Sequence, residues 1–71
     1  MTAKQYQAAR RALEWSHALL AETIGKSTRT SFRYASGEID IPDTVAKLVR
    51  RLVSDRLTMS NRKFDEMLHT L

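Results

Sequence analysis

The fold is decided by residues 16–38, whose sequence is SHALLAETIGKSTRTSFRYASGE. Ser16 is typical of a helix N-cap, because its hydroxyl accepts a hydrogen bond from a free backbone N–H. The apolar residues that follow share one helical face, namely Leu20, Ala21 and Ile24. Gly25 supplies the left-handed conformation that ends a helix without a Cβ clash. The first half of the stretch therefore predicts a short helix over about residues 17–24.

The second half of the stretch repeats this pattern. Ser27 is placed to cap a second helix over about residues 28–36, and Gly37 is placed to end it. Ala21 is small, so the second helix can cross close to the first. Two short helices joined by a tight turn predict a helix-turn-helix motif over residues 16–37, the arrangement that sets its second helix in a DNA major groove.

The composition indicates one small soluble domain over residues 1–71. A chain of 71 residues buries only roughly 60% of its unfolded surface, so pairing with a second copy helps its stability. The sequence has no Cys, which excludes disulfides and thiolate zinc sites. Its apolar residues form no long run, so we expect no signal peptide or membrane span and a cytoplasmic location. A single Pro and two Gly favour an all-α fold.

The excess positive charge lies in the first half of the chain. The formal net charge is +4; residues 1–37 carry six basic side chains against two acidic ones, and residues 38–71 carry six of each. The basic half contains the predicted helix-turn-helix, which suits a polyanionic partner. An ordinary solvated surface is the alternative reading of the charge alone.

Five helices are expected in all, packed as a compact four-to-five-helix bundle. In the first, over about residues 3–14, Thr2 and Gln5 suit a capping box. Its inward residues are predicted to be Tyr6, Ala9 and Leu13, and its outward ones Lys4, Gln7 and Arg11. Trp15 is expected to pack in the elbow before the second helix.

The fourth helix is predicted to begin at Pro42 and Asp43, which suit a first helical turn. Its apolar stripe is predicted to be Val45, Leu48, Val49, Leu52, Val53 and Leu57. A loop around Thr58 and Met59 then leads to Ser60, the expected cap of a fifth helix over about residues 60–71. The apolar face of that helix, predicted as a dimer interface, consists of Phe64, Met67, Leu68 and Leu71.

The ordered set of residues around the predicted motif resembles a known family. The matching positions are Trp15-Ser16, Leu20-Ala21, Ile24-Gly25, Ser27, Arg29-Thr30, Arg33-Tyr34, Ser36-Gly37-Glu38 and the segment IPDTVAKLVRRL at 41–52. Over about residues 2–55 the chain is similar to the lambda-repressor-like (Cro-type, xenobiotic-response-element) helix-turn-helix regulators, and its short form resembles compact repressors of phages and mobile elements. The resemblance implies a DNA-binding transcriptional regulator.

Three positions depart from the family pattern. Lys26 and Ser31 stand where aliphatic residues are usual, and His17 stands where a Gln usually braces the recognition helix and contacts a phosphate. Ser31 forgoes apolar burial on the order of 1–2 kcal/mol. Phe32 is then expected either to fill that gap in the core or to contact a thymine methyl or a backbone sugar.

The resemblance implies that Thr28, Arg29 and Arg33 approach base edges, with Phe32 beside them. The chemistry agrees, since an Arg can donate two hydrogen bonds to guanine O6 and N7. Phosphate contacts are expected from helix starts and flanking donors, namely Ser16, His17, Lys26, Ser27 and Thr30. For Ser16 and Ser27, helix capping is itself a sufficient role.

No catalytic or metal-binding constellation is found in the sequence. His17 and His69 lack partners at metal-ligand spacing, and there is no Gly-rich phosphate loop or nucleophile–base pair. We therefore expect no enzymatic activity, no cofactor, no metal and no small-molecule ligand.

The expected mechanism is a homodimer that binds a palindromic double-stranded operator and blocks polymerase. The resemblance implies control of its own operon, and activation through contact with polymerase stays open as an alternative to blocking. The alternative is a protein-binding adaptor, of antitoxin or antiactivator type, that keeps the fold. Leu19 motivates this alternative, because it stands where the family usually has a polar residue and is expected to be exposed.

Overall fold

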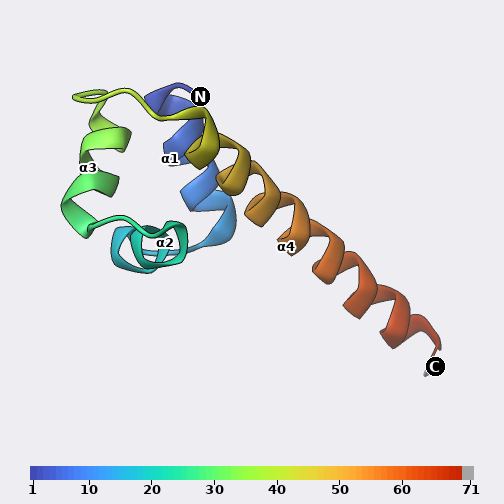
Figure 1. The fold of residues 1–71 in the computed structure, drawn as a ribbon. Helices are drawn as coiled ribbons and strands as arrows, with labels where there is room; N and C mark the ends of the chain where they lie inside the picture. The colour runs from blue at the N-terminus through green and yellow to red at the C-terminus, as the bar shows by residue number, and fades with distance from the viewer. Residues whose placement is uncertain (70–71) are drawn as a thin grey trace.

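Four α-helices make up the fold of the computed structural model, which describes the backbone of residues 1–69 and the side chains of residues 1–56. They are α1 (Ala3–Leu13), α2 (His17–Ile24), α3 (Thr28–Ser36) and α4 (Asp43–His69), and these residues contain no strand. The secondary structure of residues 1–69 is therefore all-helical, as expected. Figure 1 shows α2 and α3 on one side of α1, and α4 extending away toward the C-terminus.

The first three helices begin at the predicted caps, and α2 and α3 end at the predicted glycines. The hydroxyls of Thr2, Ser16 and Ser27 each accept from the backbone N–H three residues later, and Thr2 and Gln5 form a complete capping box. Gly25 and Gly37 end α2 and α3 at φ +74° and +80°. The bounds predicted for these two helices are confirmed to the residue.

The prediction of a fifth helix is wrong, because α4 runs without interruption from Asp43 to His69. The expected loop at Thr58 and Met59 and the expected cap at Ser60 both fall inside it. After Pro42 the sequence has no Gly or Pro to break a helix. Thr and Ser inside a helix cost only about 0.5 kcal/mol each relative to Ala, too little to end it.

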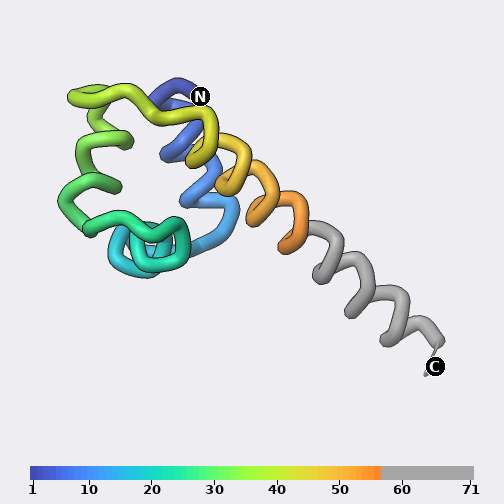
Figure 2. The backbone as a smooth tube through the Cα atoms, in the orientation of Figure 1, coloured from blue at the N-terminus to red at the C-terminus, as the bar shows by residue number. Residues whose placement is uncertain are grey.

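The core lies between α1 and the other three helices. Its fully buried members include Tyr6 and Leu13 from α1, Leu20 from α2 and Val49 from α4. The rings of Tyr6 and Tyr34 meet edge to face, with centroids 5.6 Å apart. This packing holds α1 against α3 and α4, whose chain paths can be followed in Figure 2.

Two predicted side-chain positions need correction. Leu48 is 37% exposed while Ala46 is buried, so the apolar stripe of α4 is centred on Val49, with Leu52 and Val53 partly buried beside it. Gln7 does not face solvent fully, because its amide Nε2 donates to the Ala35 carbonyl 2.5 Å away. The predicted Trp15 position is confirmed, since it packs against the core.

Polar contacts tie α4 to the end of α1. The Arg56 guanidinium donates to the Leu13 carbonyl and, 2.8 Å away, to the Glu14 carboxylate. Glu14 itself ends α1 at φ +59°, the left-handed region that favours glycine. The sequence places Glu14 inside the first helix, whereas the structure makes it the cap.

Candidate functional site

Helix α3 is buried on one side and exposed on the other. Ser31, Tyr34 and Ala35 face the core, as predicted for Ser31 and Tyr34. The opposite side carries four side chains that we call the α3 surface: Thr28, Arg29, Phe32 and Arg33. The first three are exposed, and Arg33 is half-buried. The four residues predicted as base contacts thus lie together on one helix face.

The two arginines of the α3 surface have different surroundings. Arg29 is exposed and forms no ion pair within residues 1–56. The Nε of Arg33 lies 3.7 Å from the Glu38 carboxylate, and both side chains of this ion pair are accessible to solvent. Such exposed pairs contribute about 0–1 kcal/mol, so Arg33 can leave Glu38 at little cost.

The residues predicted to contact phosphates surround the starts of α2 and α3. Lys26 is exposed in the turn between them. The Ser27 and Thr30 hydroxyls lie 2.9 Å apart and hydrogen-bond each other beside the α3 cap. Ser16 is exposed and caps α2 by accepting from Leu19 N–H. These polar groups therefore lie at or beside the N-terminal ends of two helices.

His17 behaves differently from the other residues in this predicted set. Its Nδ1 lies 2.8 Å from the Ser31 hydroxyl, which in turn lies 2.6 Å from the Tyr6 hydroxyl. Phe32 stacks on the imidazole, with ring centroids 4.1 Å apart and an interplanar angle of 29°. The core-filling alternative for Phe32 is wrong, because this side chain is 56% exposed, and the buried Ser31 hydroxyl is instead hydrogen-bonded to Tyr6 and His17.

Burial shifts the pKa of two members of this chain of hydrogen bonds. The pKa of His17 lies below its ordinary value, first because of desolvation and then because of the nearby positive charge of Arg10. Burial raises the pKa of Tyr6, against the opposing effect of its bond to Ser31. Both shifts favour the uncharged forms.

Sequence reasoning missed the joint role of Tyr6, Ser31 and His17. Each appeared singly: Tyr6 as a core residue, and the other two as separate departures from a family pattern. A signal was available, because a buried tyrosine hydroxyl needs a hydrogen-bond partner. The natural partners were His17 and Ser31, two polar residues on neighbouring helices that stand where the family pattern has other residue types.

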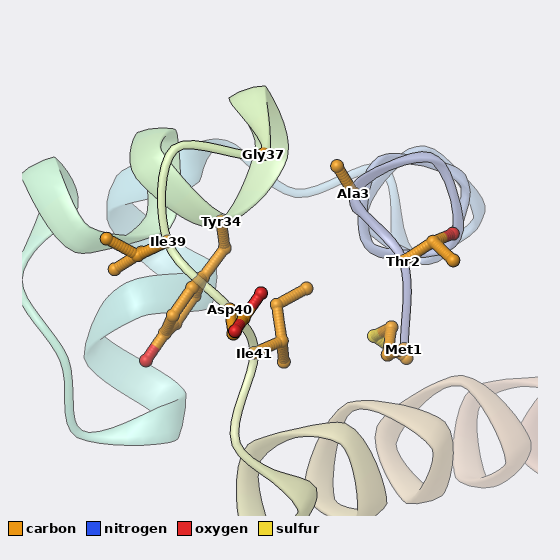
Figure 3. A pocket seen from close by; sticks show the side chains of 8 residues that line it. All are labelled: Met1, Thr2, Ala3, Tyr34, Gly37, Ile39, Asp40 and Ile41. Carbon is orange, nitrogen blue, oxygen red and sulfur yellow. The ribbon is translucent and has the colours of Figure 1, made fainter.

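A hollow of about 350 Å³ lies between the N-terminal residues and the connection from α3 to α4 (Figure 3). Tyr34, Gly37 and the segment 39–41 line one side of it, and residues 1–3 line the other. The lining contains none of the residues predicted to contact DNA. The hollow therefore belongs to a part of the surface separate from the α3 surface.

The described residues contain neither a metal-binding cluster nor a membrane-spanning helix. No group of three or more His, Asp or Glu side chains there lies close enough to hold a metal ion. No helix in that part of the chain has an apolar stretch long enough to cross a bilayer. The predicted dimer residues Phe64, Met67, Leu68 and Leu71 lie outside the described side chains.

Comparison of the chain with protein-family models, with curated proteins and with solved structures finds no match.

Proposed function

We propose that this protein is a sequence-specific DNA-binding transcriptional regulator, a homodimeric repressor that recognises a palindromic operator through a helix-turn-helix formed by α2 and α3. The observation that carries the proposal is the division of α3 into an anchored and a free face. Its anchored face packs on α1, while the α3 surface presents Arg29 to solvent. A rigid helix with exposed Arg and Thr side chains suits the donor–acceptor pattern of the major groove.

The surroundings of α3 support contact with a phosphate backbone. Lys26 adds a positive charge next to the start of α3, and the N-terminal end of a helix favours anions. At the start of α2, the Ser16 hydroxyl accepts from Leu19 N–H and the Ser16 carbonyl accepts from Leu20 N–H. The N–H groups of His17 and Ala18 have no acceptor within residues 1–56. These groups fit the positioning contacts that flank base readout.

The test starts from selection of binding sites out of a randomised duplex pool, followed by fluorescence anisotropy on the selected and a scrambled duplex at two salt concentrations. We expect selective binding that weakens with salt. Arg29→Ala should weaken binding to the selected duplex by about 1–3 kcal/mol and relax specificity at one base pair. Arg33→Ala should do the same at another position.

Arg51→Ala is the matched control, because it removes the same charge from an exposed position of α4. It should change the affinity by much less than the α3 variants. A failure to select any sequence, or equal losses from all three substitutions, contradicts specific recognition by α3.

A second candidate function is favoured by the apolar exposure of α2 and α3. Leu19 is 44% exposed, as the protein-adaptor alternative expects, and Phe32 is more exposed still. If Arg29→Ala and Arg33→Ala together leave function intact while Leu19→Glu abolishes it, the adaptor reading replaces the DNA-binding one.

A further inference from the structure

The hydrogen bonds that join α1, α2 and α3 form an unbranched chain from the core to the surface. Its inner end is the Tyr6 hydroxyl, its middle is the Ser31 hydroxyl, and its outer end is the imidazole of His17. The Tyr6 and Ser31 side chains are fully buried, while His17 is partly exposed. Water therefore does not compete for the two inner protons.

The protons of this chain have one arrangement in which every buried donor finds an acceptor. Within the described residues, the Tyr6 hydroxyl has the Ser31 hydroxyl as its partner, so Tyr6 donates to Ser31. The Ser31 hydroxyl must then donate its hydrogen bond to His17 Nδ1. Among the described residues, the Ser31 hydroxyl hydrogen-bonds Tyr6 and His17 and no carbonyl of its own helix. Thr23 differs, because its hydroxyl donates to the Leu19 carbonyl.

The opposite direction leaves a buried proton without an acceptor. If His17 carried its proton on Nδ1, it would donate a hydrogen bond to Ser31, and the Ser31 hydroxyl would then donate to the Tyr6 oxygen. The tyrosine proton would then have no acceptor in the described structure, and an unsatisfied buried donor is strongly disfavoured. This chain of hydrogen bonds therefore favours the His17 tautomer whose Nδ1 accepts a hydrogen bond from Ser31.

We infer that Tyr6 and Ser31 are positioning residues that fix His17 in its Nε2–H tautomer and present that N–H as a directed donor to a phosphate of bound DNA. Ring geometry directs Nε2 away from Ser31, and the stacked Phe32 ring limits rotation of the imidazole. The phosphate role rests on the proposed function, whereas the tautomer is a property of the free protein.

The tautomer is tested by heteronuclear NMR of the imidazole nitrogens in the free protein at neutral pH, with a His69→Gln variant to assign the signals. We expect a protonated Nε2 and an unprotonated Nδ1 for His17. The Tyr6→Phe/Ser31→Ala double variant removes both hydroxyls without leaving one unpaired, and it should give a mixture of tautomers. A mixture or a protonated Nδ1 in the unaltered protein overturns the inference.

The donor role is tested by comparing His17→Asn with His17→Gln. Asn places an amide oxygen near the position of Nδ1, so Ser31 keeps an acceptor, but it lacks the outward N–H. It should weaken binding to the selected and scrambled duplexes alike by about tenfold. Gln reaches the position of Nε2 with an amide N–H and should restore most of the affinity.

The two proposals fail separately. Unchanged affinity of His17→Asn for DNA that the unaltered protein binds selectively overturns the donor role and leaves the proposed function standing. Absence of DNA binding by the unaltered protein overturns the proposed function and the donor role together. The NMR spectrum still decides in that case whether Tyr6 and Ser31 set the tautomer.

Discussion

Ser31 shows how a single polar residue can replace an apolar one in a small core. The sequence presents it as a loss of apolar burial, which a neighbouring Phe32 could offset. The structure instead gives the buried hydroxyl two partners from two other helices. A buried polar group that is fully hydrogen-bonded avoids most of its desolvation cost, and it links the helices more specifically than a methyl group does.

Ser31→Ala is expected to destabilise the protein by about 1–3 kcal/mol, because it leaves the buried Tyr6 hydroxyl without a partner. The measurement is urea unfolding followed by circular dichroism. Adding Tyr6→Phe should recover much of the loss, since no buried hydroxyl then remains unpaired. Additive losses in this double-mutant cycle would show that the two hydroxyls do not interact.

At the scale of the element, the short helices are defined by their ends. Each of the first three begins at a Thr or Ser cap and ends at a residue with positive φ. Such local signals act within a few residues of chain, which is why the bounds of α2 and α3 could be predicted. The end of the predicted fourth helix lacked a signal of this kind, and the structure continues α4 through it.

Gly25→Ala should cost about 1–2 kcal/mol of stability, measured by urea unfolding. A Cβ at this position meets no atom within 4 Å, so the cost comes from the φ of +74° alone. Glu14→Gly makes the reverse change at a residue with φ +59° and should lose less or gain stability, even though it removes the contact with Arg56. Equal losses from both variants would contradict this account.

At the scale of the whole molecule, α1 is the helix that links α3 to α4. It packs against α3 and α4, contributes Tyr6 to the hydrogen-bonded chain, and receives Arg56 from α4 at its end. The orientation of α3 therefore depends on contacts far apart in the sequence. This links global stability to the geometry of the proposed recognition helix.

Acidification is expected to lower the stability of the whole molecule through His17. Its pKa in the folded protein lies below the ordinary value of 6.5, so the unfolded chain takes up the proton first. The contribution of His17 is complete above pH 6.5 and is lost as the pH falls. Melting temperatures over roughly pH 5 to 8 should show a smaller decline for His17→Asn than for the unaltered protein.

The homodimer stays a prediction from the apolar residues Phe64, Met67, Leu68 and Leu71. We expect a dimer at micromolar concentration by sedimentation velocity, and Leu68→Glu should dissociate it by placing a charge in the predicted interface. Leu48→Glu is the matched control, because it makes the same change at a half-exposed position of the same helix. A monomeric unaltered protein would count strongly against a dimeric repressor.

The sequence by itself determined the all-helical class, the N-caps Thr2, Ser16 and Ser27, the bounds of α2 and α3 and the inward face of Ser31 and Tyr34. Caps, glycine stops and helical periodicity depend on neighbours a few residues away, so they can be read along the chain. Only the tertiary structure decided that His17, Ser31 and Tyr6 meet, that Phe32 is exposed and that Ala46 replaces Leu48 in the core. These features depend on how the four helices approach one another, and Tyr6 and Ser31, 25 positions apart, are brought into contact by packing rather than by local pattern.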